Sequence, residues 1–276
     1  MPELPEVETV VRHIGPLVSG RSIEGFTAHW HKVTAPETAE RFAAQVTGQR
    51  IETFVRRGKF ILLQLEHGWV HIHLRMTGQL LVADNGQKSN AHIRASFDLS
   101  GMRSLLFKDT RKFGRIGYLN DLAILMDKLG PEPLESSFTP HQLANMLHGS
   151  RRQVKPLLLD QSFIAGLGNI YVDEALFRAR IHPATAARAI STVKAHRLHR
   201  AIQEVLTESI RLKGTTFRSF RFGADQSGEF RQSLQIFGRM GEPCPNCGTK
   251  ISKIRIAQRG THFCGRCQRK IGAHNS

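Results

Sequence analysis

The sequence lacks long apolar runs, targeting signals and most of the cysteine that a disulfide-rich protein would need. No apolar stretch reaches the roughly 18 residues of a membrane-spanning helix. The N-terminus, MPELPEVE, is acidic and has none of the basic and apolar regions of a signal peptide. We therefore expect a soluble intracellular protein. Its 276 residues contain no internal repeat and are enough for two or three compact domains.

Acidic residues are scarce relative to basic ones. The chain has 23 Asp and Glu against 39 Lys and Arg, a formal net charge of +16. This excess predicts a polyanionic partner, above all nucleic acid, because each neutralised phosphate releases counterions. An acidic lipid surface would call for an amphipathic basic helix with aromatic anchors, and the sequence has none. A basic surface that serves only solubility is the remaining alternative.

Cysteine is absent from the first 243 residues, and all four cysteines lie close together near the C-terminus. They form two C-x2-C pairs separated by 16 residues, Cys244 with Cys247 and Cys264 with Cys267. This spacing predicts one tetrahedral zinc site, with free thiols or a redox pair as the alternative. Gly248 and Gly265 stand where the two knuckles need turns. Four thiolates leave no open coordination position, so the zinc is expected to be structural.

The segment from Cys244 to Ser276 contains no Asp or Glu and seven Lys or Arg. Four thiolates and Zn²⁺ together add only about −2, so the segment keeps a charge of about +5. Between the cysteine pairs, ISKIRIAQRGTHF alternates Ile with Lys and Arg. This pattern predicts a β-hairpin with one basic face that can contact phosphates in a groove. A solvated charged face is the alternative.

Hydrophobic periodicity predicts an α+β protein. Residues 5–15 match a helix that Gly15-Pro16 would end. From about residue 22 to 119 the period falls to two, which predicts a β-sandwich with one short helix near 37–46. The individual strand predictions are 50–57, 59–66, 69–75, 92–99 and 103–108.

The pattern becomes helical after the proline-rich stretch at 130–133, which predicts a linker. Thr139-Pro140 matches a helix cap followed by proline in the first turn. A long helix is expected over 187–213, ended by Gly214.

Pro2 is a candidate nucleophile. Removal of Met1 would expose a secondary amine whose pKa lies near ~8, so part of it would be unprotonated at neutral pH. Such an amine can attack an aldehydic carbon and form an iminium. Glu3 and Glu6 stand nearby and could move protons. The alternative is that PELPEVE is only a well-capped helix start.

Seven stretches spread over almost the whole chain resemble one family, the bacterial formamidopyrimidine-DNA glycosylases (Fpg, also called MutM). They are PELPEVET at 2–9, RRGKF at 56–60, HLRMTGQL at 73–80, KDTRKFGR at 108–115, GLGNIYVDEALF at 166–177, GEPCPNCG at 241–248 and AQRGTHFCGRC at 257–267. Their common order, together with the cysteine spacing, makes the resemblance specific.

The resemblance implies a bifunctional glycosylase and lyase that flips 8-oxoguanine or a formamidopyrimidine out of duplex DNA. Pro2 would attack C1′ and form a Schiff base, and Glu3 would be the general acid and base. Lys59 matches the lysine linked to β-elimination and phosphate contact. Arg259 matches the arginine linked to phosphate binding and δ-elimination. The product would be a one-nucleotide gap with phosphate at both ends.

The resemblance also implies a set of DNA contacts. Met76, Arg111 and Phe113 match the residues that fill the space left by the flipped nucleotide, although periodicity alone would favour core packing for Met76 and Phe113. Asn169 matches the phosphate-binding residue of a helix–two-turns–helix motif. Further residues match or adjoin DNA-contact positions: His73, His92, Arg151, Arg152 and, as a further basic candidate, Lys155.

The sequence departs from the family pattern at two places. LQIFGR has Phe237 where many relatives have Tyr, which removes one hydroxyl contact to DNA. The segment 218–230 matches the family's lesion-covering loop only loosely.

Two other functions explain part of the pattern. An endonuclease VIII-type glycosylase for oxidised pyrimidines would share the fold and Pro2, but Leu4, Arg111 and Phe113 favour the Fpg branch. A noncatalytic zinc protein that binds DNA would explain the charge and the cysteines but not PELPEVE with Lys59.

The expected organisation is a catalytic β-sandwich with flanking helices at 1–130, a linker at 131–134, a helix–two-turns–helix domain at 135–228 and a four-cysteine zinc finger with a β-hairpin at 229–276. We expect one structural Zn²⁺, damaged double-stranded DNA as partner, a monomer, and a cytoplasmic location at the bacterial nucleoid.

Overall fold

Two antiparallel four-stranded sheets form the first half of the chain, as the alternating pattern predicts. The computed structural model describes residues 1–84, 91–215 and 228–270. One sheet has the strand order β1-β6-β7-β5 and the other β2-β3-β4-β8. The strands are β1 (Ile23–Ala28), β2 (Ile51–Arg57), β3 (Phe60–Leu65), β4 (Trp69–His73), β5 (Gly78–Asp84), β6 (Ile93–Leu99), β7 (Arg103–Asp109) and β8 (Arg115–Leu119). The N-terminal β-sandwich is confirmed, and β1, β5 and β8 add to the strands predicted individually.

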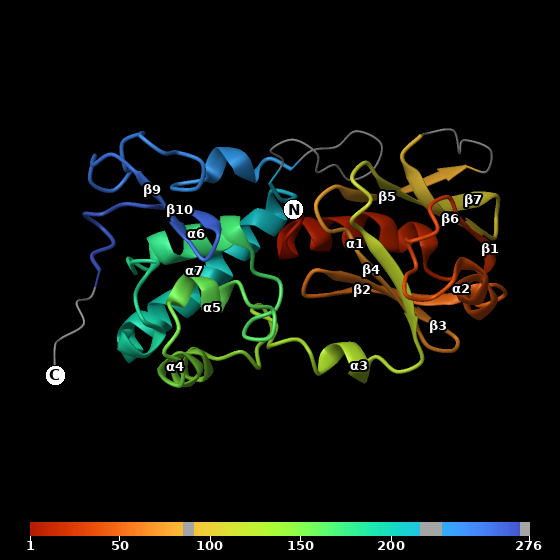
Figure 1. Cartoon of the computed structure of the whole chain (residues 1–276), viewed down its shortest axis with the longest axis horizontal. Helices are drawn as coiled ribbons and strands as arrows, with labels where there is room; N and C mark the ends of the chain where they lie inside the picture. Colours follow the sequence, from red (N-terminus) through yellow and green to blue (C-terminus); the bar gives the residue numbers. More distant parts are fainter. Residues whose placement is uncertain (85–90, 216–227, 271–276) are drawn as a thin grey trace. The chain divides into compact units, whose positions relative to one another are not determined.

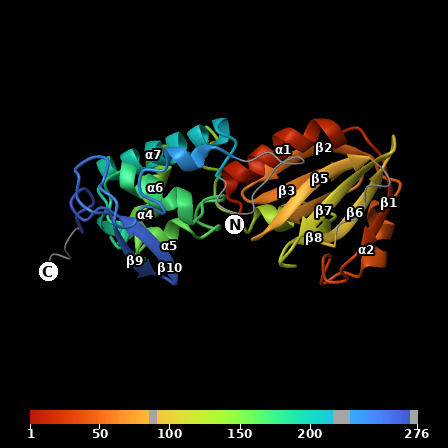
Figure 2. The same cartoon turned by 90° about the horizontal axis from the view of Figure 1, so that it is seen from above.

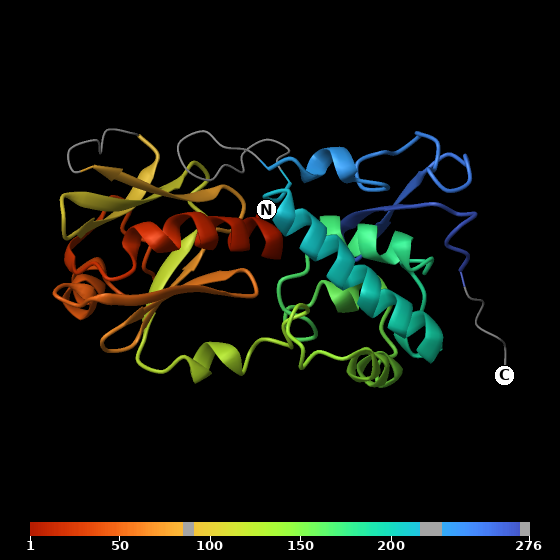
Figure 3. The same cartoon turned by 180° about the vertical axis from the view of Figure 1, so that it is seen from behind.

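Helix α1 (Leu4–Val18) runs alongside both sheets (Figures 1 and 3). Val7, Ile14 and Val18 are at most 1% exposed and belong to the sandwich core. The predicted end at Gly15-Pro16 is wrong, since Pro16 lies inside the helix. A proline in the last turn removes only one backbone donor, and burial of Val18 favours the extra residues.

Short helices complete the first half of the chain. Helix α2 (Ala39–Val46) confirms the predicted helix near 37–46, and the Thr38 side chain caps it by accepting from the Arg41 amide at 3.3 Å. Helix α3 (Ala123–Met126) follows the last strand.

The second half is helical and ends in a hairpin. Its elements are α4 (Pro140–His148), α5 (Val154–Leu158), α6 (Asn169–Arg178), the 3-10 turn η1 (Ala187–Ala189), α7 (Thr192–Arg211), the 3-10 turn η2 (Phe230–Ser233), β9 (Ser252–Ile256) and β10 (Arg259–Phe263). Strand β10 packs beside α6 (Figure 2). Thr139 caps α4 by accepting from the Gln142 amide at 3.1 Å, as predicted.

The single helix predicted over 187–213 is wrong, because the segment divides into η1 and α7. Ile190 separates them with extended dihedral angles (φ −81°, ψ 117°) and is completely buried. Burial of this one side chain favours a break that the continuous apolar pattern does not predict.

The chain divides into two compact units whose limits differ from the expected domain ranges. One unit comprises 1–128 and 212–231, and the other comprises 129–211 and 232–276. The described residues 212–215 and 228–231 belong to the unit that contains the sheets, and the Thr215 amide donates to Glu6 Oε1 at 2.7 Å. Gly214 has φ +82°, and a Cβ there would lie 2.9 Å from Glu6 Oε1, so its close approach requires glycine. No helix within the described ranges has the length and apolarity needed to cross a membrane.

Candidate functional site

The N-terminus is held in place by its own first helical turn. Pro2, Glu3 and Glu6 are buried, and Glu3 and Glu6 are only 3% and 2% exposed. Glu3 is the N-cap of α1 and forms a reciprocal capping box with Glu6, whose Oε2 accepts from the Glu3 amide at 2.8 Å. The predicted nucleophile therefore adjoins a rigid turn, although its nitrogen still carries Met1.

Glu6, a predicted proton carrier, is held by two backbone amides. One of its carboxylate oxygens accepts from the Glu3 amide, and the other accepts from the Thr215 amide. These contacts give Glu6 the geometry of a group that orients the N-terminus, whereas Glu3 lies next to Pro2 in sequence. The sequence does not show this difference between Glu3 and Glu6, because both are acids at the start of a helix.

Lys59 and His73 meet on the second sheet. Lys59 lies in the tight turn between β2 and β3, after Gly58 with φ 56°, and is 5% exposed. His73 pairs with Phe60 across β3 and β4, and the two rings pack edge-to-face at 4.8 Å. The sequence suggested that His73 is a surface contact, but it is only 8% exposed.

Burial, together with the positive charges of Arg75 and Lys59, lowers the pKa of His73 to about 3. Its Nδ1 accepts from the Arg75 amide at 3.0 Å, which requires that nitrogen to be unprotonated. His73 is thus neutral at pH 7 and cannot serve there as a cation for phosphate.

We expect His73→Gln to flatten the acid side of the stability profile. Between pH 6.5 and about 3 the unfolded chain binds the proton and the folded chain does not. The stabilisation is therefore complete above pH 6.5 and is lost as the pH falls through this window. Denaturant unfolding of both proteins across these pH values measures it. The wild-type slope should exceed the variant's by up to about 1.4 kcal/mol per pH unit, and identical slopes would contradict the account.

Met76 and Phe113 are exposed, which excludes core packing for both. They are 37% and 46% exposed and lie in the β4–β5 and β7–β8 connections. The guanidinium carbon of Arg111, also an exposed residue, lies 4.6 Å from the centre of the Phe113 ring. Exposed apolar side chains beside a cation are suited to enter a base stack.

Asp109 holds both of these connections in place, and no motif in the sequence predicts this role. It is completely buried at the end of β7. Its Oδ1 accepts from the Thr77 hydroxyl and from the Arg111 amide at 3.1 Å. Its Oδ2 accepts from the amides of Phe113 and Gly114, both at 2.8 Å. One carboxylate therefore fixes the backbone beside all three residues expected to fill the space of the flipped nucleotide.

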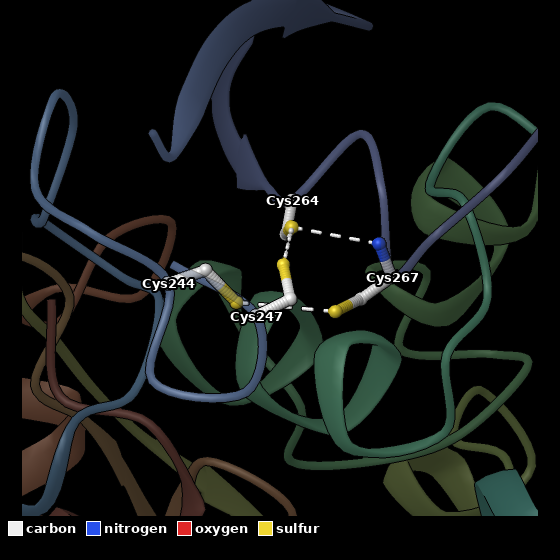
Figure 4. A group of neighbouring side chains, drawn as sticks. All are labelled: Cys244, Cys247, Cys264 and Cys267. Carbon is white, nitrogen blue, oxygen red and sulfur yellow. Dashed lines mark hydrogen bonds between the residues drawn. The ribbon is translucent and has the colours of Figure 1, made fainter. Parts of the chain in front are cut away.

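The four cysteines converge as the spacing predicts (Figure 4). Their Sγ atoms all lie within 4.8 Å of one another, with 3.9 Å between Cys244 and Cys267 and 3.5 Å between Cys247 and Cys264. Four thiolates around one zinc at about 2.3 Å would lie about 3.8 Å apart, whereas a disulfide needs about 2.05 Å. The cluster thus fits one tetrahedral zinc ion.

The knuckle turns follow the prediction only in part. Gly248 has φ 74°, which favours glycine. Gly265 does not have a positive φ, and the nearest atom to a Cβ there would be 4.0 Å away. The expected need for glycine at 265 is therefore wrong.

Asp173 and Glu174 on α6 bind the hairpin and the segment before it, and no sequence motif predicts these contacts either. Asp173 Oδ1 accepts from Lys155 Nζ at 2.6 Å, and its Oδ2 accepts from the His262 amide at 2.9 Å. Lys155 is completely buried in this pair, so it is not the exposed phosphate contact that we expected. The available signal was two acids inside the apolar run IYVDEALF.

Glu174 holds the segment before the knuckles. Its carboxylate accepts from the amides of Gln235, Ile236 and Phe237, at 2.9 to 3.1 Å. Burial raises the pKa of Glu174, while these amides oppose the rise. The Phe237 ring packs edge-to-face on His262 at 5.0 Å, so the residue that departs from the family pattern supports the hairpin.

Asn169 binds the hairpin beside Arg259, through the carbonyl of Gly260. Asn169 Nδ2 donates to the carbonyl of Gly260 at 3.0 Å, and Lys155 Nζ donates to the same oxygen at 3.1 Å. The turn residues Ala257 and Gln258 both have positive φ, as in a two-residue hairpin turn. Arg259, directly after the turn, is exposed.

The hairpin does not separate into one exposed basic face and one buried apolar face as the alternation predicts. Residues 252–255 of β9 are all exposed, including Ile254 at 38%. Its two faces therefore both meet solvent over most of the strand.

The remaining predicted contacts lie at the surface of their own units. His92, Arg151 and Arg152 are exposed, and Arg152 pairs with Asp160 at 2.8 Å. Most of the predicted lesion-covering loop, residues 218–227 of 218–230, lies outside the described residues, and only 228–230 are placed.

Comparisons with known proteins agree with this geometry. Sequence models of three domains match: the formamidopyrimidine-DNA glycosylase N-terminal domain over residues 1–116, its H2TH domain over 129–221, and the zinc finger found in FPG and IleRS over 241–269. A formamidopyrimidine-DNA glycosylase of Chloroflexus aurantiacus is 46% identical over 97% of this chain and 98% of its own.

Solved structures show the same similarity. Fpg (MutM) of Lactococcus lactis, crystallised with DNA containing N7-benzyl-Fapy-dG, aligns with a TM-score of 0.90 and 35% identity, over 98% of this chain and all of its own. A MutM in complex with DNA containing carbocyclic 8-oxo-G gives the same TM-score, identity and coverage. The family predicted from the motifs and the single structural zinc site are confirmed, and the chain belongs to the formamidopyrimidine-DNA glycosylase family.

Proposed function

We propose that this protein excises oxidised purines, 8-oxoguanine and formamidopyrimidines, from duplex DNA and then cleaves the strand at the resulting abasic site. The observation that carries the proposal is the buried N-terminal turn, in which Glu3 and Glu6 fix the backbone next to Pro2. Family membership and relatives crystallised with Fapy-dG and 8-oxo-G DNA support the substrate class.

The reaction begins once Met1 is removed. The Pro2 nitrogen forms a bond to C1′ of the damaged nucleotide, and the bond to the base breaks with its electron pair leaving on the base. Ring opening of the sugar gives a cationic iminium at C1′, which acidifies the proton on C2′. Glu3 is the group that donates and accepts protons in these steps.

Two eliminations then remove the sugar. Loss of the C2′ proton expels the 3′ phosphate, and a second elimination expels the 5′ phosphate. Lys59, buried beside the second sheet, assists the first elimination, and the exposed Arg259 binds phosphate and assists the second. Hydrolysis of the iminium regenerates Pro2 and leaves a one-nucleotide gap with phosphate at both ends.

DNA binding is shared between the two units. Met76, Arg111 and Phe113 enter the stack, and the guanidinium hydrogen-bonds the unpaired cytosine. Asn169 contacts phosphate, and the zinc ion stabilises the hairpin that carries Arg259 without taking part in chemistry. Further contacts come from the exposed basic residues His92, Arg151 and Arg152.

We place the protein in the bacterial cytoplasm at the nucleoid, acting as a monomer. The proposed ranges of the functional regions remain 1–130, 131–134, 135–228 and 229–276. These ranges follow the sequence motifs, whereas the two compact units follow the contacts between residues.

Parallel cleavage assays test the substrate class. Duplexes carrying 8-oxoguanine opposite cytosine should be cut with kcat/KM at least about tenfold above duplexes carrying thymine glycol. An undamaged duplex of the same sequence is the control. Preferential cutting of thymine glycol would instead assign the protein to the oxidised-pyrimidine class.

A further inference from the structure

A cationic cavity beside the zinc site has no part in the proposed reaction. It has a volume of about 480 Å³. Five cations and no carboxylate line it, together with one amide and two of the cysteines: Arg180, Lys194, Arg197, Arg266, Arg269, Asn246, Cys247 and Cys267. All of these residues belong to one compact unit, and none is among the residues assigned to the lesion.

The side chains of the five cations are not engaged by other groups of the protein in the described residues. Within the ranges that the structure describes, none of their side chains has an ion pair or a hydrogen bond. By contrast Arg178, two residues before Arg180, pairs with Glu208 at 2.8 Å. The charges of the cavity are therefore available to a ligand.

The zinc centre does not account for this charge. Cys247 and Cys267 line the cavity and are part-buried. Their side chains belong to the four-cysteine cluster (Figure 4). A zinc ion with four thiolates carries a charge of about −2, so five cations leave the cavity at about +3. Two of the five cations would be enough to balance the charge of the metal centre.

Two of the cations occupy positions that local preference disfavours. Arg180 follows α6 with φ 55°, in a Schellman turn where the Arg180 amide donates to Phe177 O and the Ile181 amide to Leu176 O, both at 3.0 Å. Glycine is the usual residue there, because a side chain disfavours this backbone conformation.

Lys194 lies in the first turn of α7, which contains no acidic residue. The positive end of the helix dipole disfavours a cation at this position. Cations kept at two unfavourable positions of one cavity indicate a binding role rather than a stabilising one.

We infer that this cavity binds a second stretch of nucleic-acid backbone, in addition to the duplex that carries the lesion. No aromatic or aliphatic side chain lines it, so it offers no surface on which a base could stack. It would therefore recognise phosphodiester charge without regard to sequence. The identity of the ligand rests on the proposed function, since it assumes that DNA is the protein's substrate.

The test uses zinc-loaded, full-length protein saturated with a short lesion duplex in which the sugar resists cleavage. A fluorescent undamaged oligonucleotide is then added, and its anisotropy reports a second binding event. We compare Lys194→Gln/Arg197→Gln with Arg200→Gln/Arg211→Gln, which removes two exposed cations from the same helix outside the cavity. Zinc content and melting curves establish that both variants fold.

Wild type and the control should bind the second oligonucleotide, and the cavity variant should bind it about tenfold more weakly. The slope of log K against log salt should fall by about 2 in the cavity variant, since two phosphate contacts are lost. Absence of a second event in wild type, or equal loss in both variants, overturns the inference.

Inorganic pyrophosphate distinguishes nucleic acid from a small phosphate compound. Displacement of the second oligonucleotide only at a large excess of pyrophosphate supports a backbone site, and displacement at equal phosphate concentration overturns it. Cleavage of an ordinary lesion duplex by wild type is measured in parallel. If cleavage fails while the second event persists, the proposed function is wrong and the cavity still binds polyanion.

Discussion

Replacing Cys244 by serine is expected to abolish specific DNA binding, weakening it at least about 100-fold, and to abolish lesion cleavage with it. Structural zinc sites contribute on the order of 10–16 kcal/mol of apparent folding free energy to their modules. Loss of one of four clustered thiolates removes that contribution. The hairpin that presents Arg259 would then lose the metal and keep only protein contacts, among them the hydrogen bonds to Asp173, Lys155 and Asn169.

The measurement pairs zinc content with binding of a lesion duplex. Ser252→Ala is the matched control, because Ser252 is exposed in the same module and is not a ligand. It should retain zinc and affinity. Normal cleavage by a zinc-free Cys244→Ser protein would contradict the account.

Asp109→Asn is expected to separate lesion excision from the lyase step. Whichever way the amide turns, its NH2 group faces at least one backbone N–H donor, because Oδ1 accepts from the Arg111 amide and Oδ2 from the Phe113 and Gly114 amides. Unsatisfied buried polar groups cost about 1–3 kcal/mol each, so stability should fall by about 2–4 kcal/mol. Met76, Arg111 and Phe113 would lose their fixed backbone.

Excision of 8-oxoguanine from duplex should therefore fall about 10- to 100-fold. Cleavage of an abasic site in single-stranded DNA should change far less, since no opposite base has to be contacted. Asp98→Asn on the same sheet is the matched control, and it should preserve both activities. Equal losses on the two substrates would show that Asp109 has only a general effect on folding.

The sequence predicted residues whose chemistry is set by spacing or by position in the chain. The four cysteines are an example, because zinc coordination demands particular ligands at particular intervals. The strands follow from side-chain alternation, which the sheets preserve. Pro2 is predicted as the nucleophile on similar grounds, because only an N-terminal proline presents a secondary amine.

Residues that bind backbone groups could not be found in this way. Asp109, Asp173 and Glu174 each accept from main-chain amides that fold back from other segments. Backbone donors are the same at almost every position, so no partner residue marks them in the sequence. For the same reason the sequence does not show that backbone amides hold Glu6, or that Lys155 and His73 are buried.

Borohydride trapping on a duplex containing 8-oxoguanine tests the central claim most directly. Reduction of the iminium would fix the DNA to the protein, and mass spectrometry of the digested adduct would locate the attachment. The account predicts an adduct on the Pro2 nitrogen of Met1-processed protein, one that persists in Lys59→Gln and is strongly reduced in Pro2→Gly. An adduct on a lysine, or no adduct from processed protein that binds the duplex tightly, would contradict it.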